Sequence, residues 1–299
     1  MSVLLDRYEL LLSNNSILIN LGPGHKVLTN VSPEGEIQPI HSIGIGKVDA
    51  DLTISADKNL KYSQAEMAFG ITKVAAVCTA DFSDGVCRAG IKSSTSKGEV
   101  SLIIIIEAAM TGSAMARAAI TATETITALI QDLDVRAENG ICGSFTGKIN
   151  MAIITDNESK LTLRSAGKHS KLGELIGNVV YDAVRQSVIA NGFAEDSQMD
   201  VITRLERMGF DIEKAISQNL PETNKMKEKL RMLLENPKYK VVFSSLLLLN
   251  DEILWGLIPE NSGLTTGRKM IELVFEQSCE ESNDLISCFI QTSIQKIKE

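Results

Sequence analysis

One segment, VSLIIIIEAAM from Val100 to Met110, is so apolar that it limits which folds the chain is able to adopt. The run is too short to span a bilayer, and it contains Glu107. Short apolar runs of this kind are typical of strands that are buried on both faces of a sheet. We therefore predict a buried central strand here, with the rest of the fold built around it.

Other short apolar or alternating segments, bounded by Gly, Asn, Asp or Ser, recur up to about residue 160 and predict further strands. They cover residues 16–22, 26–32, 73–82, 99–108 and 149–155, and one more strand is predicted over 160–167. Helical patterns cover 63–72, 112–133 and the segment from about Lys171 to Ala190. This mixture predicts an α/β fold in which a layered sheet is covered by helices.

The pattern changes after the polar segment NGFAEDSQMD, and we place a domain boundary near residue 195. Beyond it, helical patterns cover 200–216, 224–235, 239–258, 268–278 and 284–298. Pro221, Pro237 and Pro259 fall at the expected breaks between helices. The sequence therefore predicts one α/β domain over 1–195, followed by an all-α C-terminal module over 196–299.

Composition excludes several classes of function. The net charge of −8 argues against a nucleic-acid-binding protein, because such proteins gain affinity from lysine and arginine contacts to phosphate. The five cysteines are odd in number and none forms a CxxC pair, and with three histidines in all they argue against a zinc site. We expect free thiols in a reducing compartment, with no metal and no cofactor.

The N-terminal segment MSVLLDRYELLLSNNS carries Asp6 and Glu9 through its apolar part, which does not fit a signal peptide. No other segment is apolar for long enough to cross a bilayer. We therefore expect a cytoplasmic protein that does not associate with a membrane.

A histidine stands in a glycine-rich turn within SAGKHSKLGELIGNVVYDAVRQSV, residues 165–188. His169 lies between Gly167 and Gly173, directly before the predicted helix. Gly167 would allow a sharp strand-to-helix turn through a backbone conformation closed to other residues. A histidine next to a bound polar group is able to act as an acid or base near neutral pH. The alternative is a surface histidine beside an ordinary helix cap.

Several neighbours of this histidine are candidate ligand contacts. Ser170 is placed to cap the helix, and Glu174 follows four residues later, one beyond the usual capping-box spacing. The first turn of a helix offers unpaired N–H groups and a partial positive charge, which suit a carboxylate, a phosphate or a polarised carbonyl oxygen. Lys168 and Lys171 add positive charge at the same place.

A second candidate lies in ITATETITAL, residues 120–129, where Glu124 stands in a helix of Ala, Thr and Ile. No lysine or arginine lies within one turn on either side. A carboxylate in such surroundings is a candidate general acid or base. An alternative of equal weight is that Glu124 points into solvent from an amphipathic helix.

Two polar loops complete the set of candidates. Ser144 and Thr146 lie between Gly143 and Gly147, just before an apolar strand, and Ser83 and Asp84 follow another apolar strand. Loops of this composition are able to present hydroxyls and backbone amides to a ligand. Ligands in α/β sheets bind where strands end in loops, so these segments are considered together.

The four segments TADFSDGVCRAG, ITATETITALIQDL, GSFTGKINMAII and AGKHSKLGELIGNVVYDAV are similar in order and spacing to the adenosylcobinamide amidohydrolases of corrinoid salvage. That family has the patterns TAGxSNAxxAG, TATEAKxxAL, TGTxTDAxxVA and AGTHTxLGELIGxAVxxAV. The resemblance covers about Leu12 to Asn191 and is most specific over 165–184.

The resemblance implies an enzyme, of a kind found in archaea, that hydrolyses the amide joining aminopropanol to the corrin ring and yields adenosylcobyric acid. In that reaction, Glu124 would activate water and His169 would protonate the leaving amine, while the helix N-terminus would stabilise the oxyanion. Ser83, Asp84, Ser144, Thr146, Gly167, Lys168, Ser170 and Glu174 would then contact the corrinoid.

Three positions depart from the family patterns. Asp84 replaces an asparagine, Gly147 replaces an aspartate, and Thr125-Ile126 replaces an alanine-lysine pair. The alternative to an enzyme is therefore a divergent, non-catalytic relative that binds a corrinoid or another large cofactor without cleaving it.

The tail more faintly resembles the helical family of phosphatidylglycerophosphatase A and the α-ribazole-phosphate phosphatase, through DVITRLERMGFDIEKAI and LLLLNDEILWGLIPEN. The acidic helix of that family is replaced here by GRKMIELVFEQ, so no phosphatase activity is predicted. The alternative is a helical cap or a dimerisation module, which would make the chain a homodimer.

Overall fold

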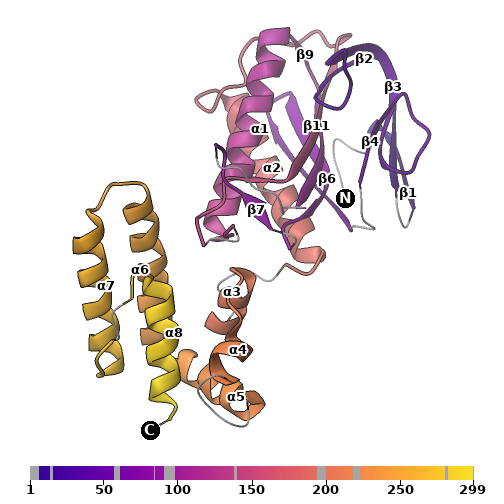
Figure 1. Cartoon of the computed structure of the whole chain (residues 1–299). Coiled ribbons are helices and arrows are strands. Elements are labelled where there is room, and N and C mark those ends of the chain that lie inside the picture. Colours follow the sequence, from indigo (N-terminus) through magenta and orange to yellow (C-terminus); the bar gives the residue numbers. More distant parts are fainter. Residues whose placement is uncertain are drawn as a thin grey trace. The chain divides into compact units, whose positions relative to one another are not determined.

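The computed structural model describes residues 7–13, 16–56, 61–83, 85–90, 98–137, 140–193, 200–217, 223–279 and 282–298. The chain forms two compact units (Figure 1). Unit 1 consists of residues 1–135 and 143–194, and unit 2 consists of residues 136–142 and 195–299. The division after residue 194 lies beside the predicted boundary, but the short segment 136–142 groups with the helical unit.

Unit 1 is built on an eight-stranded sheet in the order β4-β3-β2-β11-β8-β6-β5, with β1 paired to β2. Its strands are β1 (Glu9–Ser13), β2 (Ser16–Thr29), β3 (Glu36–Gly46), β4 (Leu52–Ile54), β5 (Tyr62–Phe69), β6 (Thr72–Asp81), β8 (Glu99–Ile106) and β11 (Lys148–Asp156). Strand β8 lies between β6 and β11, and all eight of its residues are buried. The prediction of a buried central strand is therefore confirmed.

Two helices cover one face of this sheet. Helix α1 (Gly112–Asp132) and helix α2 (Lys171–Ala190) pack on alternate residues of the central strands, such as Ala76, Leu102 and Ile104. Helix α1 buries residues about four apart, including Ala114, Ala118 and Ala122, so one stripe of the helix faces the sheet. The bounds of both helices agree with the predicted segments.

Strands, rather than helices, cover the other face. Residues such as Ile103 and Ile105 of β8 share a core with Ile43 and Ile45 of β3. The pairing of β2 with β3 shifts register between Asn20 and His25, and Gly22 and Gly24 have φ values of 76° and 83° in this stretch. The register shift lets the long hairpin bend back over the sheet. The α/β class is confirmed, but helices cover only one side.

The predicted helix over 63–72 is wrong. This segment forms β5 and the turn into β6, with Gly70 at a φ of 60°. The two strands pair along their whole length, from Tyr62 opposite Thr79 to Phe69 opposite Thr72. The short apolar pattern fits either structure, and pairing with a strand that is already part of the sheet decides between them.

Two pairs of very short strands complete unit 1. Strand β7 (Val86–Cys87) pairs with β10 (Phe145–Thr146), and β9 (Ala109–Met110) pairs with β12 (Thr162–Leu163). Of the strand predicted over 160–167, only β12 forms. The residues that follow it make the loop leading into α2.

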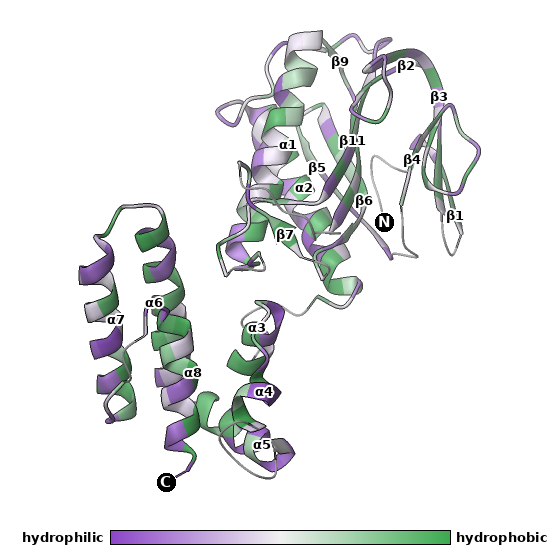
Figure 2. Cartoon of the chain, viewed as in Figure 1, coloured by the Kyte–Doolittle hydropathy of each residue, from purple (hydrophilic) through white to green (hydrophobic). Residues whose placement is uncertain are grey.

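Unit 2 contains helices α3 (Val201–Arg207), α4 (Ile212–Ser217), α5 (Thr223–Leu234), α6 (Pro237–Leu254), α7 (Glu260–Phe275) and α8 (Leu285–Lys296). Its core is aromatic at the centre, where Tyr239 stacks on Phe275 at 4.6 Å and Phe289 contacts both Phe243 and Phe275. Figure 2 shows both hydrophobic and hydrophilic residues along these helices. The all-α prediction for this region is confirmed.

Prolines mark the helix starts in unit 2 as predicted. Pro237 is the first residue of α6 and Pro259 is the N-cap of α7. Proline is tolerated there because the first N–H groups of a helix have no intrahelical partner. Pro221 lies outside the described residues.

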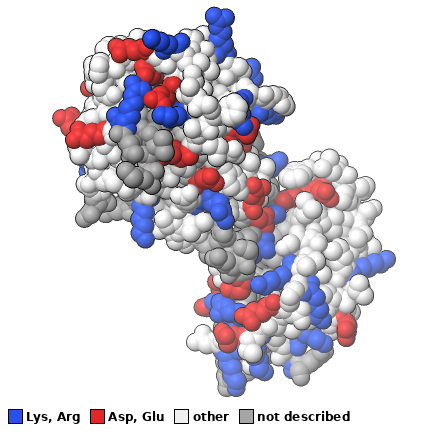
Figure 3. Space-filling model, turned by 180° about the vertical axis from the view of Figure 1, so that it is seen from behind, with Lys and Arg blue, Asp and Glu red and all other residues white. Residues whose placement is uncertain are grey.

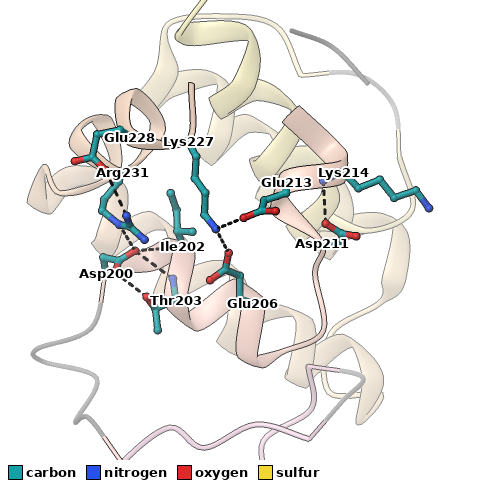
Figure 4. Close-up of polar contacts among 10 residues, drawn as sticks. All are labelled: Asp200, Ile202, Thr203, Glu206, Asp211, Glu213, Lys214, Lys227, Glu228 and Arg231. Atoms are coloured by element: carbon teal, nitrogen blue, oxygen red, sulfur yellow. Dashed lines mark hydrogen bonds and ion pairs between the residues drawn. The ribbon is translucent and has the colours of Figure 1, made fainter. Parts of the chain in front are cut away.

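Charged side chains connect α3, α4 and α5 (Figure 4). Lys227 Nζ lies 2.7 Å from Glu206 and 3.0 Å from Glu213, and Arg231 lies 3.5 Å from Asp200. Asp200 also caps α3 by accepting from the backbone N–H of Thr203. Burial alone would raise the pKa of Asp200, but the hydrogen bonds from Thr203 and the charge of Arg231 lower it below its usual value.

A buried ion pair fixes segment 136–142 within unit 2. Arg136 Nη1 lies 2.8 Å from Asp251 Oδ2, and the side chains are 8% and 2% exposed. Asp251 also accepts from the N–H of Cys142, and Arg136 donates to the Gly140 carbonyl. A buried pair of this kind is costly to break, because removing one partner leaves the other charge without compensation.

On the face shown in Figure 3, acidic and basic side chains are interspersed. No helix among the described residues is long and apolar enough to cross a membrane. All five cysteines are free, and burial raises the pKa of the Cys78 thiol to about 12. Among the residues that the structure describes, no group of three or more His, Cys, Asp or Glu side chains is arranged to hold a metal ion.

Candidate active site

A cavity of about 350 Å³ lies between α1 and the loop that precedes α2. The helix contributes Arg117, Ile120, Thr121 and Glu124, and the loop contributes Ser165, Gly167, Lys168, His169 and Ser170. Glu124 and His169, which are 45 residues apart in the sequence, therefore line one cavity.

The helical side of the cavity follows from helix periodicity. Positions 120 and 121 lie three or four residues from both 117 and 124, so the four side chains project along one stripe of α1. Thr121 in the middle of this stripe is buried, and its Oγ1 donates to the Ala166 carbonyl at 2.8 Å. This bond fixes the helix against the loop.

The loop side is held by the cap of α2. Ser170 Oγ accepts from the Gly173 N–H at 3.1 Å and donates to the Gly167 carbonyl at 2.8 Å, and the Ser170 N–H donates to the same carbonyl. The predicted cap is therefore present. Because the Gly173 amide is used by the cap, it is not available to a ligand.

Gly173, rather than Gly167, is the glycine that the turn requires. A Cβ at position 173 would lie 2.1 Å from the Gly167 carbonyl oxygen, which is backbone and has no freedom to move aside. Gly167 itself does not have a positive φ, and a Cβ there would meet only Arg117 at 3.4 Å. The prediction that Gly167 adopts a conformation closed to other residues is wrong, because the close approach of two backbone segments, and not a left-handed turn, sets the requirement.

The cavity contains both signs of charge. Arg117 and Lys168 are basic side chains, Glu124 is an acidic one, and all three are exposed, as is His169. Within the described residues, none of these four side chains forms an ion pair or a hydrogen bond. They are therefore available to a bound molecule.

The cavity is not lined by four other predicted contacts, Ser83, Ser144, Thr146 and Glu174. Glu174 pairs with Lys171 at 2.7 Å on the surface of α2. Ser83 donates through its N–H to Asp81 at 2.8 Å, and Asp84 lies outside the described residues.

The hydroxyls of the loop before β11 are used inside the fold. Ser144 Oγ accepts from the Ala89 N–H at 2.9 Å, and the buried Thr146 Oγ1 donates to the Lys148 carbonyl at 2.9 Å. The loop does contact α1, because Thr127 Oγ1 donates to the Ser144 carbonyl at 2.8 Å. Ser144 and Thr146 therefore have structural partners and support the helix.

Arg117 is a lining residue that the sequence analysis did not select. It lies seven residues before Glu124, which is two helical turns and about 10 Å along the axis. The signal was available, because Arg117 falls on the same helical stripe as Glu124. Arg117 lies two turns from Glu124, beyond the single turn on which the prediction for Glu124 was based.

A second depression, of about 460 Å³, continues along α1. Ala119, Ile120, Thr123, Glu124, Thr127, Ala128 and Gln131 line it. Ile120 and Glu124 border both spaces, so the depression and the cavity are neighbours on α1.

Together, these groups have the chemistry that hydrolysis of a carbonyl compound requires. A carboxylate is able to take a proton from water, an imidazole is able to deliver one to a leaving group, and two cations are able to stabilise negative charge on oxygen. All of them border one cavity that is open to solvent.

Comparison with known proteins gives one family match, and similarity to a curated protein and to a solved structure. Residues 52–193 match the family model of adenosylcobinamide amidohydrolase (CbiZ). The uncharacterized protein MJ1613 of Methanocaldococcus jannaschii is 34% identical over 94 residues, which are 31% of this chain and 36% of that protein, so the match spans about a third of its length. The crystal structure of the PH0078 protein from Pyrococcus horikoshii OT3 aligns with 62% of this chain and 83% of its own, at 11% identity and a TM-score of 0.37.

Proposed function

We propose, from the premise that residues 52–193 belong to the adenosylcobinamide amidohydrolase family, that this chain hydrolyses the amide joining aminopropanol to the corrin ring of adenosylcobinamide. The products are adenosylcobyric acid and aminopropanol, as expected of an enzyme of corrinoid salvage. The observation that carries the proposal is that Glu124 and His169 border one cavity with two cations.

In the proposed mechanism, Glu124 accepts a proton from a water molecule as the water oxygen attacks the amide carbon. The resulting oxyanion lies beside Arg117 and Lys168, which stabilise its charge. Protonated His169 then donates to the amide nitrogen, the carbon–nitrogen bond breaks, and the carboxylic acid and the free amine leave. Two proton transfers return Glu124 and His169 to their starting states.

This mechanism differs in one respect from the prediction that the N-terminus of α2 stabilises the oxyanion. The N–H groups of Ser170 and Gly173 are already bonded within the cap, and Lys171 and Leu172 do not line the cavity, whereas the two cations have no partner in the described part of the chain. The side chains of Arg117 and Lys168 also border the cavity directly. We therefore assign charge stabilisation to the cations.

A spectral titration with adenosylcobinamide, followed by chromatography for aminopropanol, tests the proposal. We expect a saturable spectral change and release of one aminopropanol for each adenosylcobyric acid formed. Binding with no release would show that the chain is not an amidohydrolase for this substrate.

Binding without cleavage is the second candidate function, and Gly147 favours it. The family pattern has an aspartate at this position, and the hydroxyls of Ser144 and Thr146 beside it are used inside the fold. A non-catalytic relative would bind cobinamide and adenosylcobyric acid with similar affinity and release no amine. The same titration with both compounds separates the two functions.

A further inference from the structure

We propose that the depression along α1 binds the corrin ring, while the neighbouring cavity receives only the amide arm. This inference rests on the proposed function and adds the location of the ring. Its starting observation is that two spaces of different character share Ile120 and Glu124 at their border.

The volume of the cavity limits which part of the ligand it is able to hold. The cavity beside His169 has a volume of about 350 Å³, near the lower end of the range for sites of drug-sized ligands. A corrinoid is much larger than such a ligand, so the cavity has room for the aminopropanol arm but not for the ring. The ring must therefore lie outside the cavity, against a surface that borders it.

The depression has the chemistry of a surface for a broad ligand whose edge carries uncharged polar groups. Apart from Glu124 at its border, none of its lining residues is charged, and Ile120 is 50% exposed. Ala119 and Ala128 have small side chains, which allow a flat molecule to approach the helix closely. Burial of exposed apolar atoms such as those of Ile120 favours binding.

The threonines of the depression match the edge of a corrin ring. Thr123 Oγ1 donates to the Ala119 carbonyl at 2.9 Å, and Thr127 Oγ1 donates to the Ser144 carbonyl at 2.8 Å. With its hydrogen used in this way, each hydroxyl oxygen remains as an acceptor. The corrin edge carries primary carboxamides, whose N–H groups are donors. Gln131 is able both to donate and to accept at the far end of the depression.

The proposed placement also brings the amide to the charged groups. A ring lying over residues 123–131 directs its arm past Ile120 and Glu124 into the cavity that contains His169. The scissile amide would then lie between the carboxylate and the imidazole.

Ala128→Trp tests the proposal, because Ala128 borders the depression but not the cavity. Ala116→Trp is the matched control, since Ala116 is an exposed residue of the same helix and borders neither space. The probe is dicyanocobinamide, and the readout is its dissociation constant by spectral titration. We expect Ala128→Trp to raise this constant at least 10-fold and Ala116→Trp to change it less than 2-fold. Circular dichroism and the melting temperature of each variant report whether the helix is intact.

The outcomes separate this inference from the proposed function. Equal binding by Ala128→Trp and the unchanged chain would overturn the ring site, even if the unchanged chain releases aminopropanol. Weaker binding by Ala128→Trp alone would support the ring site, even if no aminopropanol is released. An unchanged chain that binds no dicyanocobinamide would contradict both.

If Ala128→Trp does not fold, Thr123→Val provides a second test, because it removes the hydroxyl acceptor at similar volume. This change should raise the dissociation constant of dicyanocobinamide at least 3-fold, and an unchanged constant would overturn the inference.

Discussion

Unit 1 and unit 2 hold their helices by different means. In unit 1, α1 and α2 pack on strands whose residues are apolar and buried, and two side-chain-to-backbone bonds, from Thr121 and Ser170, fix the loop of the candidate site. In unit 2, the aromatic core is supplemented by ion pairs on and below the surface, including Arg136 with Asp251. The cavity and most of the family match lie in unit 1. The difference indicates that changes to unit 2 should affect its stability and that changes to unit 1 should affect the chemistry.

The largest expected effect on stability comes from the buried ion pair of unit 2. Asp251→Ala leaves the buried Arg136 without its carboxylate partner, so the free energy of unfolding of unit 2 should fall by about 3–5 kcal/mol. Urea unfolding followed by circular dichroism measures this change. As a control, a double variant with Arg136→Met and Asp251→Leu removes both charges and should recover most of the loss. Unchanged unfolding of Asp251→Ala would show that the pair contributes little.

The largest expected effect on catalysis comes from the two titratable groups of the cavity. Glu124→Gln removes the proposed base and His169→Ala removes the proposed acid, so each should lower the rate of hydrolysis by about 100-fold or more. The substrate dissociation constant should change far less, because the proposed corrin contacts are spread over a large surface. The rate of aminopropanol release at saturating substrate is the measurement.

Matched controls for these two changes lie outside the cavity. Glu174→Gln alters an exposed carboxylate that is paired with Lys171, and His41→Ala alters an exposed histidine on β3. Neither should change the rate by more than about 2-fold. Similar losses in the control and test variants would point to a general effect on folding, and the roles assigned to Glu124 and His169 would then be wrong.

A smaller effect is expected where the α2 cap meets the loop. Gly173→Ala places a methyl group against the Gly167 carbonyl, and overpacking of this kind costs about 1–3 kcal/mol. The loop that carries His169 must shift, so the rate of hydrolysis should fall together with the melting temperature. Gly167→Ala is the control, because its methyl group meets only the flexible end of Arg117. A Gly173→Ala variant with the stability and rate of the unchanged chain would contradict the observed contact.

The smallest effect concerns the pH dependence of unit 2. Because the pKa of Asp200 is lowered in the folded state, its contribution to stability is present above the unfolded pKa, about 3.9 for aspartate, and is lost as the pH falls through the lower folded value. Asp200→Asn keeps a residue able to cap α3 but removes the charge. We expect its unfolding free energy to depend less on pH below about 4 than that of the unchanged chain. If the unfolding free energy of both proteins had the same slope against pH below about 4, Asp200 would not be the source of this pH dependence.

Local patterns were sufficient to predict α1, α2 and the central strand. Their signals, an apolar run and a helical repeat with a cap at Ser170, depend on neighbours in the sequence. The bent hairpin over the second face and the pairing of β5 with β6 depend on distant partners. No strand was therefore predicted over 36–46, and 63–72 was wrongly predicted to be a helix. Arg136 and Asp251 are 115 residues apart, and no local pattern relates them.

For the same reason, only part of the candidate site could be predicted from the sequence. Glu124 and His169 were selected for their unusual sequence surroundings, and only the packing of α1 against the loop brings them to one cavity. Ser144 and Thr146 were selected because hydroxyls between glycines suit a ligand, but such hydroxyls serve equally well to close a turn.

A crystal structure of the Glu124→Gln variant with adenosylcobinamide tests the central claim most directly, because slowed hydrolysis should preserve the substrate. The account predicts the aminopropanol amide in the cavity, with its carbonyl oxygen facing Arg117 or Lys168, its nitrogen about 3 Å from His169 and the ring over residues 123–131. A corrinoid bound elsewhere on unit 1, with its amide away from positions 124 and 169, would contradict it.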